Sequence, residues 1–169
     1  MQSVRHHVLR LGCAALFSLL GCSILPSAQA TQIVLPSHIP ADCVESAGQT
    51  YDVPVMVLLA VMRQESGGRP VLGHNTNGTV DIGPAQVNSS AWAGYLDRQY
   101  GIKTDDLMHM CQALRVEAFI LRKVSNEHCA GRVLWCGVGY YHSSNPKLRK
   151  DYVAAVYNQY LRMMRKGRF

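Results

Sequence analysis

The sequence lacks internal repeats, low-complexity segments and any linker long enough to separate two folded domains. Repeat architectures require a fixed period along the chain, so the missing period excludes solenoids and repeat arrays. The chain has 169 residues, and one domain usually takes about 100–200 residues. We therefore expect one folded domain, which we assign to residues 31–169.

Long hydrophobic runs are also scarce, and the most apolar one lies in residues 11–25. This run is too short for a comfortable membrane span, which takes about 20 residues. Arg5 and Arg10 precede the run, and small residues flank a cleavage site at Ala30. This arrangement is typical of a secretory signal peptide. We expect residues 1–30 to be removed after Ala30 and the mature protein to be periplasmic.

A second interpretation of the same segment stays open. Residues 19–22 read Leu-Leu-Gly-Cys and resemble a lipobox, which would make Cys22 the lipidated first residue of an outer-membrane lipoprotein. We favour cleavage after Ala30, because the small-residue site lies where a signal peptide requires it.

Acidic residues are few: 11 Asp and Glu stand against 17 Lys and Arg, a net charge of +6. Residues 31–169 keep 15 of the basic residues and all 11 acidic ones, a net charge of +4. A mildly basic chain suits an acidic polymer. Nucleic acid is the usual alternative, but export and the missing nucleic-acid-binding motifs argue against it.

Four of the six cysteines follow residue 30, namely Cys43, Cys111, Cys129 and Cys136. An even number in an exported chain favours two disulfides, and three pairings are possible. Cys129 and Cys136 are close enough in sequence to clip a turn, which would leave Cys43 for Cys111. A zinc site formed by the last two cysteines with His128 and His142 is a less favoured alternative, because an oxidising compartment favours disulfides.

Helical patterns dominate the chain, and one polar insert interrupts them. We expect helices over residues 40–51, 54–66, 89–100, 111–126, 132–141 and 146–166. Apolar residues of the last helix, including Tyr152, recur at three-four spacing and predict core packing. In the insert, Asn77-Gly78 favours a hairpin turn and residues 79–82 alternate like a short strand. The fold class is therefore α+β, mostly α, with a small β-hairpin insert.

Two helix starts carry capping signals. Asp52 precedes the second helix, and Ser89-Ser90 precede the third. Short polar side chains of this kind accept hydrogen bonds from the free N–H groups of a first helical turn. We expect these residues to cap the two helices.

Glu65 is the candidate catalytic residue. It follows the apolar run of residues 55–62 and precedes two helix-stopping glycines. Burial and the negative end of the helix dipole both disfavour a carboxylate there. Both effects favour the protonated form, which suits a general acid. The alternative is a solvated glutamate, or one paired with Arg63 or Arg69.

Three segments carry a family resemblance. They read Gln-Glu-Ser-Gly-Gly at residues 64–68, Asn-Thr-Asn-Gly-Thr-Val-Asp-Ile-Gly-Pro-Ala-Gln-Val-Asn at residues 75–88, and Val-Gly-Tyr-Tyr-His-Ser at residues 138–143. In this order and spacing they resemble the lytic transglycosylase domain of the goose-type lysozyme superfamily. The small exported members of type IV secretion, conjugation and type IV pilus systems are the most similar. The resemblance covers nearly all of residues 40–160 and implies a lysozyme-like domain.

The resemblance also implies residue roles. Glu65 would be the sole catalytic acid and base. The hydroxyl of Tyr141 would approach its carboxylate, and the amide of Gln86 would bond substrate. The expected substrate-binding set is Ser66, Gln86, Asn88, Tyr141 and His142. As alternatives, Gln86 and Asn88 would satisfy backbone groups in the hairpin, Tyr141 would be a core aromatic, and His142 would be a hydrogen-bonded wall residue.

The sequence departs from the family pattern at two places. Pro84-Ala85 stands where many members carry two larger apolar residues, and His142 stands where many carry asparagine. These departures affect subsite contacts more than chemistry.

The role of Asp81 distinguishes two possible reactions, hydrolysis and the lyase reaction. Most glycosidases use two carboxylates, and Asp81 is the nearest one after Glu65 in the sequence. A water held by Asp81 would make the enzyme a hydrolytic muramidase. Goose lysozymes carry a second acid after the Gln-Val step, where this chain has Asn88. We therefore expect Asp81 to order the hairpin, and the enzyme to be a lyase.

The expected reaction cleaves the MurNAc-GlcNAc β-1,4 bond of peptidoglycan and forms 1,6-anhydro-MurNAc. We expect no cofactor, no metal and no nucleic acid, and we expect a monomer. Expected partners are peptidoglycan glycan strands and, through the resemblance, components of a secretion, conjugation or pilus machine. A non-catalytic glycan-binding assembly subunit is the alternative from another class.

Overall fold

A computed structural model of the protein describes residues 33–130 and 134–169. The predicted signal peptide and the lipobox cysteine, Cys22, lie outside these residues. The elements follow in the order α1 (Ala41–Tyr51), α2 (Val55–Glu65), β1 (Leu72–His74), β2 (Val80–Ile82), β3 (Val87–Asn88), the π-helical turn η1 (Ser89–Ala93), α3 (Gly94–Tyr100), the 3-10 turn η2 (Asp105–Met108), α4 (Met110–His128), α5 (Leu134–His142) and α6 (Pro146–Lys166). The predicted α+β, mostly α class is confirmed.

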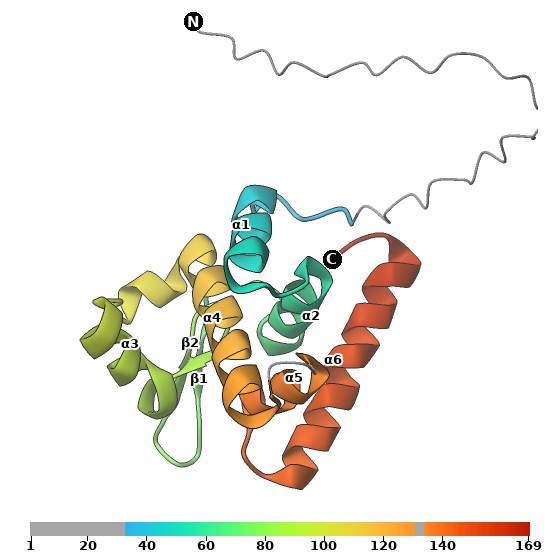
Figure 1. The fold of residues 1–169 in the computed structure, drawn as a ribbon. Helices are drawn as coiled ribbons and strands as arrows, with labels where there is room; N and C mark the ends of the chain where they lie inside the picture. The colour runs from blue at the N-terminus through green and yellow to red at the C-terminus, as the bar shows by residue number, and fades with distance from the viewer. Residues whose placement is uncertain (1–32, 131–133) are drawn as a thin grey trace, which may run out of the picture. The chain divides into compact units, whose positions relative to one another are not determined.

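The core is built around α2 and α4. Residues 57–62 of α2 are all buried, because this helix is apolar on nearly every side. Helix α4 packs against α1 and α5, and α6 packs against α2 and α5. In Figure 1, α3 and the strands lie on one side of α4, and α2, α5 and α6 lie on the other. Each large apolar side chain buried in this way stabilises the fold by about 1.5–3 kcal/mol.

The polar insert forms a three-stranded antiparallel sheet in the order β1-β2-β3. The predicted Asn77-Gly78 turn joins β1 to β2, and Gly78 has a φ of 82°, which glycine adopts without strain. The sheet pairs Gly73 with Asp81 and Asp81 with Asn88. The third strand goes beyond the predicted hairpin, because two residues after the Gly83 turn are too short to give a strand pattern.

Both predicted caps are wrong. Asp52 ends α1 in a left-handed conformation with a φ of 51°, and Pro54 precedes α2 without a side-chain cap. Asn88, not Ser89 or Ser90, caps η1, because its Oδ1 accepts hydrogen bonds from the N–H groups of Ser90 and Ala91. The helical turn η1 begins at Ser89, so the residue before it, Asn88, is in the capping position.

Two disulfides join the four cysteines of the domain. Cys43 is bonded to Cys111, which ties α1 to α4, and Cys129 is bonded to Cys136, which ties the end of α4 to α5. The pairing that the sequence left open is therefore settled. The zinc alternative is wrong, because both of its cysteines are oxidised; a zinc ligand is a thiolate.

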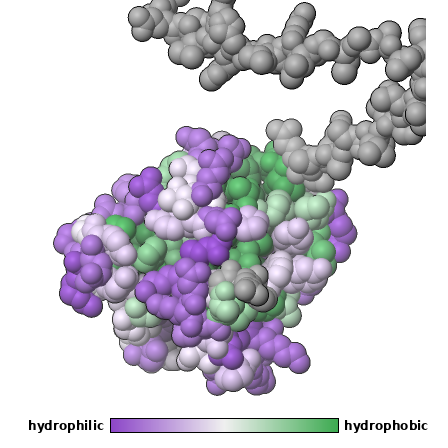
Figure 2. Space-filling model, in the orientation of Figure 1, coloured by the Kyte–Doolittle hydropathy of each residue, from purple (hydrophilic) through white to green (hydrophobic). Residues whose placement is uncertain are grey.

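The surface is largely polar. Figure 2 shows hydrophilic residues over α3 and the centre of that face, with hydrophobic residues emerging near α1 and α2. Among the described residues, none of the helices combines the length and the apolar character that crossing a bilayer requires.

Candidate active site

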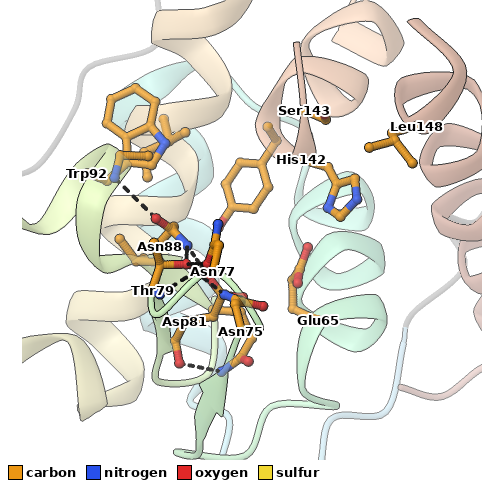
Figure 3. A pocket seen from close by; sticks show the side chains of 15 residues that line it. Glu65, Asn75, Asn77, Thr79, Asp81, Asn88, Trp92, His142, Ser143 and Leu148 are labelled. Carbon is orange, nitrogen blue, oxygen red and sulfur yellow. Dashed lines mark hydrogen bonds between the residues drawn. The ribbon is translucent and has the colours of Figure 1, made fainter. Parts of the chain in front are cut away.

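A cavity of about 460 Å³ lies where the sheet faces the ends of α2 and α5. Figure 3 shows Glu65 and His142 on one side of this cleft, and Asn75, Thr79 and Asp81 on the other. Trp92 of η1 closes the far end of the sheet side. The predicted residues Glu65, Gln86, Asn88, Tyr141 and His142 all line this one cavity.

Glu65 stands at the cleft end of α2. Burial raises the pKa of its carboxyl to about 7, the hydrogen bond from Tyr152 lowers it, and the nearby charge of Asp81 raises it. Among the described residues no salt bridge includes Glu65. Arg63 instead donates to Gln159, and Arg69 donates to the carbonyl of Ser66. A carboxyl with this pKa is both a proton donor and, after donation, a proton acceptor near neutral pH.

Tyr152 of α6 is a site residue that the sequence pattern missed. Its hydroxyl donates a hydrogen bond to Oε1 of Glu65. Burial, together with the charge of Glu65, holds the pKa of this tyrosine well above its ordinary value, so the hydroxyl stays a donor. The three-four spacing correctly placed its ring in the core. A spacing pattern does not reveal where the hydroxyl at the end of that ring points.

His142 forms the wall beside Glu65. Its ring stacks on Tyr152, with 4.5 Å between centroids and 5° between planes. Burial lowers the pKa of His142, an effect that the charge of Asp81 opposes. The neutral form of the imidazole is therefore favoured over the imidazolium.

Ser66 and Tyr141 both hold the segment that departs from the family pattern. The hydroxyl of Ser66 donates to the carbonyl of Pro84 at 2.7 Å, and the hydroxyl of Tyr141 donates to the carbonyl of Ala85 at 2.7 Å. Ser66 is buried and is not among the cavity-lining residues. Tyr141 thus lines the cleft with its hydroxyl directed to backbone, and Tyr152, not Tyr141, bonds the Glu65 carboxylate.

Gln86 directly follows Pro84-Ala85. Its φ of 49° is a strained conformation for a residue other than glycine. Its side-chain amide donates to the carbonyls of Gly83 at 2.8 Å and Val71 at 3.1 Å. The predicted alternative, that Gln86 satisfies backbone groups in the hairpin, describes these bonds. Its place in the cavity wall still gives the side chain access to a bound glycan.

Each carboxylate oxygen of Asp81 accepts a hydrogen bond from a side-chain amide. Its Oδ1 accepts from Nδ2 of Asn88 at 2.7 Å, and its Oδ2 accepts from Nδ2 of Asn75 at 2.9 Å. Asn88 also donates to the hydroxyl of Thr79 at 3.0 Å and caps η1 with its oxygen. Every polar atom of the Asn88 side chain is therefore bonded within the protein. Asp81 orders the sheet, as expected, with both of its oxygens engaged.

Glu117 is a second carboxyl that the sequence pattern did not single out. It lies on α4, is fully buried, and neither of its oxygens has a hydrogen-bond partner among the described residues. Burial and the charge of Glu65 hold its pKa well above the ordinary value. Burial of this kind favours the neutral form of the carboxyl over the carboxylate. The signal available in the sequence was an acidic residue flanked by Val116 and Ala118 on the apolar face of a helix.

Comparisons with known proteins show which family and which relatives the chain is similar to. A family model described as "Transglycosylase SLT domain" matches residues 42–159. Protein IpgF of Shigella flexneri is 30% identical over 129 residues, which cover 73% of this chain and 82% of that protein. The invasion protein IagB of Salmonella typhimurium (strain SL1344) is 29% identical over 129 residues, which cover 73% of this chain and 78% of that protein.

Proposed function

The chain belongs to the transglycosylase SLT domain family, whose members are peptidoglycan lytic transglycosylases, and we propose that Glu65 alone supplies its acid and base chemistry. The observation that carries this proposal is a half-buried carboxyl with a pKa of about 7 in a cleft. The neighbouring carboxylate, Asp81, has both oxygens bonded to amides. The resemblance of the sequence to this family is confirmed by the match over residues 42–159.

The bond cleaved is the β-1,4 bond between N-acetylmuramic acid and N-acetylglucosamine. Protonated Glu65 gives its proton to the bridging oxygen, and the bond from C1 of muramic acid to that oxygen breaks. The substrate's own N-acetyl oxygen stabilises the positive charge that develops at C1. The hydroxyl of Tyr152 donates to the carboxylate that remains. The leaving N-acetylglucosamine now carries the proton.

Ring closure follows in the same site. Glu65, now ionised, takes the proton from the C6 hydroxyl of muramic acid. The C6 oxygen bonds to C1 and yields the 1,6-anhydro product, and Glu65 returns to its protonated state. One residue serves both steps because the first step leaves it ready for the second. No water enters the product.

Polar residues of both walls of the cleft would hold the sugars. Gln86 and His142 line the cleft on its two sides. Asn88 and Tyr141 contribute to the shape of the wall, while their own polar atoms bond to protein. Ser66 would act from outside the cavity by holding Pro84 in place.

We further propose that the protein opens the peptidoglycan layer locally for a larger apparatus. The predicted export signal and the basic charge support action in the periplasm on an anionic polymer. One relative bears the name of an invasion protein, and the sequence resembles members that accompany secretion, conjugation or pilus systems. Deletion of the gene should prevent assembly of the apparatus, and a gene that carries Glu65→Gln should not restore assembly. The apparatus is identified as the one whose assembly is lost.

The Glu65→Gln variant tests the assignment. We expect cleavage of purified murein to fall by at least about 10³-fold, because general acid-base catalysis contributes about 10²–10⁴-fold in each step it serves. The variant keeps the shape of the side chain, so its unfolding midpoint is the control for folding. Mass spectrometry of released muropeptides separates the reactions, because the hydrolytic product is heavier by one water. A hydrolytic product from the wild-type enzyme contradicts the proposal. So does cleavage by a folded Gln variant at more than about a thousandth of the wild-type rate.

A further inference from the structure

A second hollowed surface lies where α1, α3 and α4 meet. Two adjoining hollows of about 340 and 360 Å³ share the rings of Tyr51, Tyr100 and Phe119, and Tyr95 lines the second hollow. We call these four residues the aromatic surface. None of them lines the cleft that contains Glu65.

The four rings form one connected cluster with Phe119 at its centre. The ring centroid of Phe119 lies 5.4 Å from that of Tyr100, 5.9 Å from that of Tyr51 and 6.5 Å from that of Tyr95. Tyr100 is 55% exposed although it is a large apolar residue, and the other three rings are half-buried beside it. Exposed apolar groups that gather in one place mark interaction sites more often than scattered ones do.

The aromatic surface is continuous with the cleft. Trp92 lines the cleft, and its ring centroid lies 6.1 Å from that of Tyr95. The next ring, Tyr100, lies 6.0 Å beyond Tyr95. Three aromatic side chains of η1 and α3 therefore lead from the cleavage site to the two hollows.

We propose that the aromatic surface is a second binding site for peptidoglycan, at which sugar rings of a glycan strand stack on Tyr100 and its neighbours. This proposal rests on the action of the family on peptidoglycan, and it adds a binding site that takes no part in the chemistry. The site keeps the enzyme on the wall between cleavage events.

The chemistry of the surface fits a glycan better than an apolar protein segment. One face of a pyranose ring presents C–H bonds, which are attracted by the negative face of an aromatic ring. Three of the four rings are tyrosines, whose hydroxyls match the hydroxyls at the rim of a sugar.

Cations border the same surface. Arg115 lines the first hollow, and its guanidinium makes no salt bridge within the part of the chain that the structure describes. Lys123 borders the second hollow, 5.5 Å from the ring centroid of Tyr95, where it is paired with Glu127. Peptidoglycan carries carboxylates on its peptides, so a strand whose sugars stack on the rings brings anions to these cations.

The Tyr100→Ala variant tests the proposal in the full chain. Both proteins carry Glu65→Gln so that strands are bound and not cut, and retention on purified sacculi is measured by sedimentation. We expect the apparent Kd of the Tyr100→Ala protein to rise at least threefold. Tyr157→Ala is the matched control, because Tyr157 is a 45% exposed tyrosine of α6 that packs on Trp135 and Tyr160. Its retention should not change.

A second measurement does not depend on how the variant folds. The Glu65→Gln protein is titrated with an N-acetylglucosamine hexamer and followed by NMR. We expect saturable shifts at the amides of Tyr51, Tyr100 and Phe119 in addition to those of the cleft. Shifts confined to the cleft, or equal retention of the Tyr100→Ala and Tyr157→Ala proteins, overturn the proposal. The products of the wild-type enzyme decide the cleavage reaction separately, so failure of the second site leaves that assignment intact.

Discussion

The two walls of the cleft differ in how they treat their polar groups. On the helical wall, Glu65 is half-buried, and Tyr152 is its one hydrogen-bond donor among the described residues. On the sheet wall, Asp81 accepts from two amides, and those amides are themselves bonded to further groups. Burial without full pairing raises the pKa of Glu65 to about 7. The two carboxyl groups of one cavity thus stand in different environments, which fits the separate tasks that we propose for them.

The contrast also explains why the sheet is needed at all. A cleft made only of apolar helices would give Glu65 its raised pKa but would offer few hydrogen bonds to sugars. Residues 72–88 supply a polar wall whose internal bonds fix its shape before substrate arrives. Preorganised polar groups lower the cost of binding.

Among variants that keep Glu65, Tyr152→Phe should have the largest effect on activity. It changes the helical wall and leaves the sheet wall intact. Hydrogen bonds to charged groups contribute about 1.5–3 kcal/mol, so we expect kcat/KM on murein to fall about tenfold or more. The bond from Tyr152 lowers the pKa of Glu65, and its removal therefore raises that pKa. The wild-type kcat/KM should fall as pH rises through about 7, because the acid must be protonated. This limb should move to higher pH in the variant.

The control for Tyr152→Phe is Tyr157→Phe, which removes an exposed hydroxyl from the same helix. It should leave both the rate and the pH profile unchanged. An unshifted alkaline limb in the Tyr152 variant would show that this hydroxyl does not act on Glu65.

On the sheet wall, Asp81→Asn should have a smaller effect on activity. We expect kcat/KM to stay within about tenfold of wild type, because Asp81 orders the sheet and carries no proton in the reaction. The unfolding free energy should fall by about 1–3 kcal/mol, because Asn75 and Asn88 lose a charged acceptor. The charge of Asp81 raises the pKa of Glu65, so the alkaline limb should move to lower pH, opposite to the shift in Tyr152→Phe.

A different result would support the hydrolytic muramidase. If Asp81 activates water, Asp81→Asn should cost about 10²–10⁴-fold, and the wild-type product should contain the added water. Rate, pH profile and product mass together therefore separate the two reactions with one variant.

The smallest effect on activity, and the clearest on stability, should come from Glu117→Gln. The pKa of Glu117 is raised in the folded protein, so the folded state holds this proton after the unfolded chain has released it. Below the unfolded pKa of about 4.5 both states are protonated and the residue costs nothing through ionisation. As pH rises above that value, the wild type loses stability, and the Gln variant lacks this loss. Urea unfolding of both proteins at pH 4, 6 and 8 measures the difference, and parallel pH dependences would contradict the prediction.

Much of the fold follows from patterns that are local in the chain. The helix predicted over residues 54–66, and found at Val55–Glu65, follows from a run that is apolar on nearly every side. The Asn77-Gly78 turn follows because few other dipeptides adopt its conformation so readily. The errors lie at element ends. Ser89 and Ser90 were predicted as caps, but Asn88 is the cap. Several adjacent polar residues satisfy the same pattern, and only the backbone path chooses among them.

The site also contains residues that local motifs predict and one residue that they do not. Glu65, Gln86, Tyr141 and His142 share one cavity, as expected from the motif, and all of them lie near the turn or helix end that the motif describes. The hydroxyl that bonds Glu65 comes instead from Tyr152, 87 residues further along the chain. No local pattern distinguishes it from Tyr157 on the same helix.

The sequence by itself determined the helical class, the polar insert and the presence of an awkward carboxylate at the end of a buried helix. These depend on hydrophobic periodicity and turn chemistry, which act over a few residues. Only the tertiary structure decided that Asp81 is enclosed by amides, that Tyr152 bonds Glu65 and that Glu117 has no hydrogen-bond partner among the described residues. The pKa of a carboxyl depends on burial and on groups brought close by folding, and those are properties of the packed molecule.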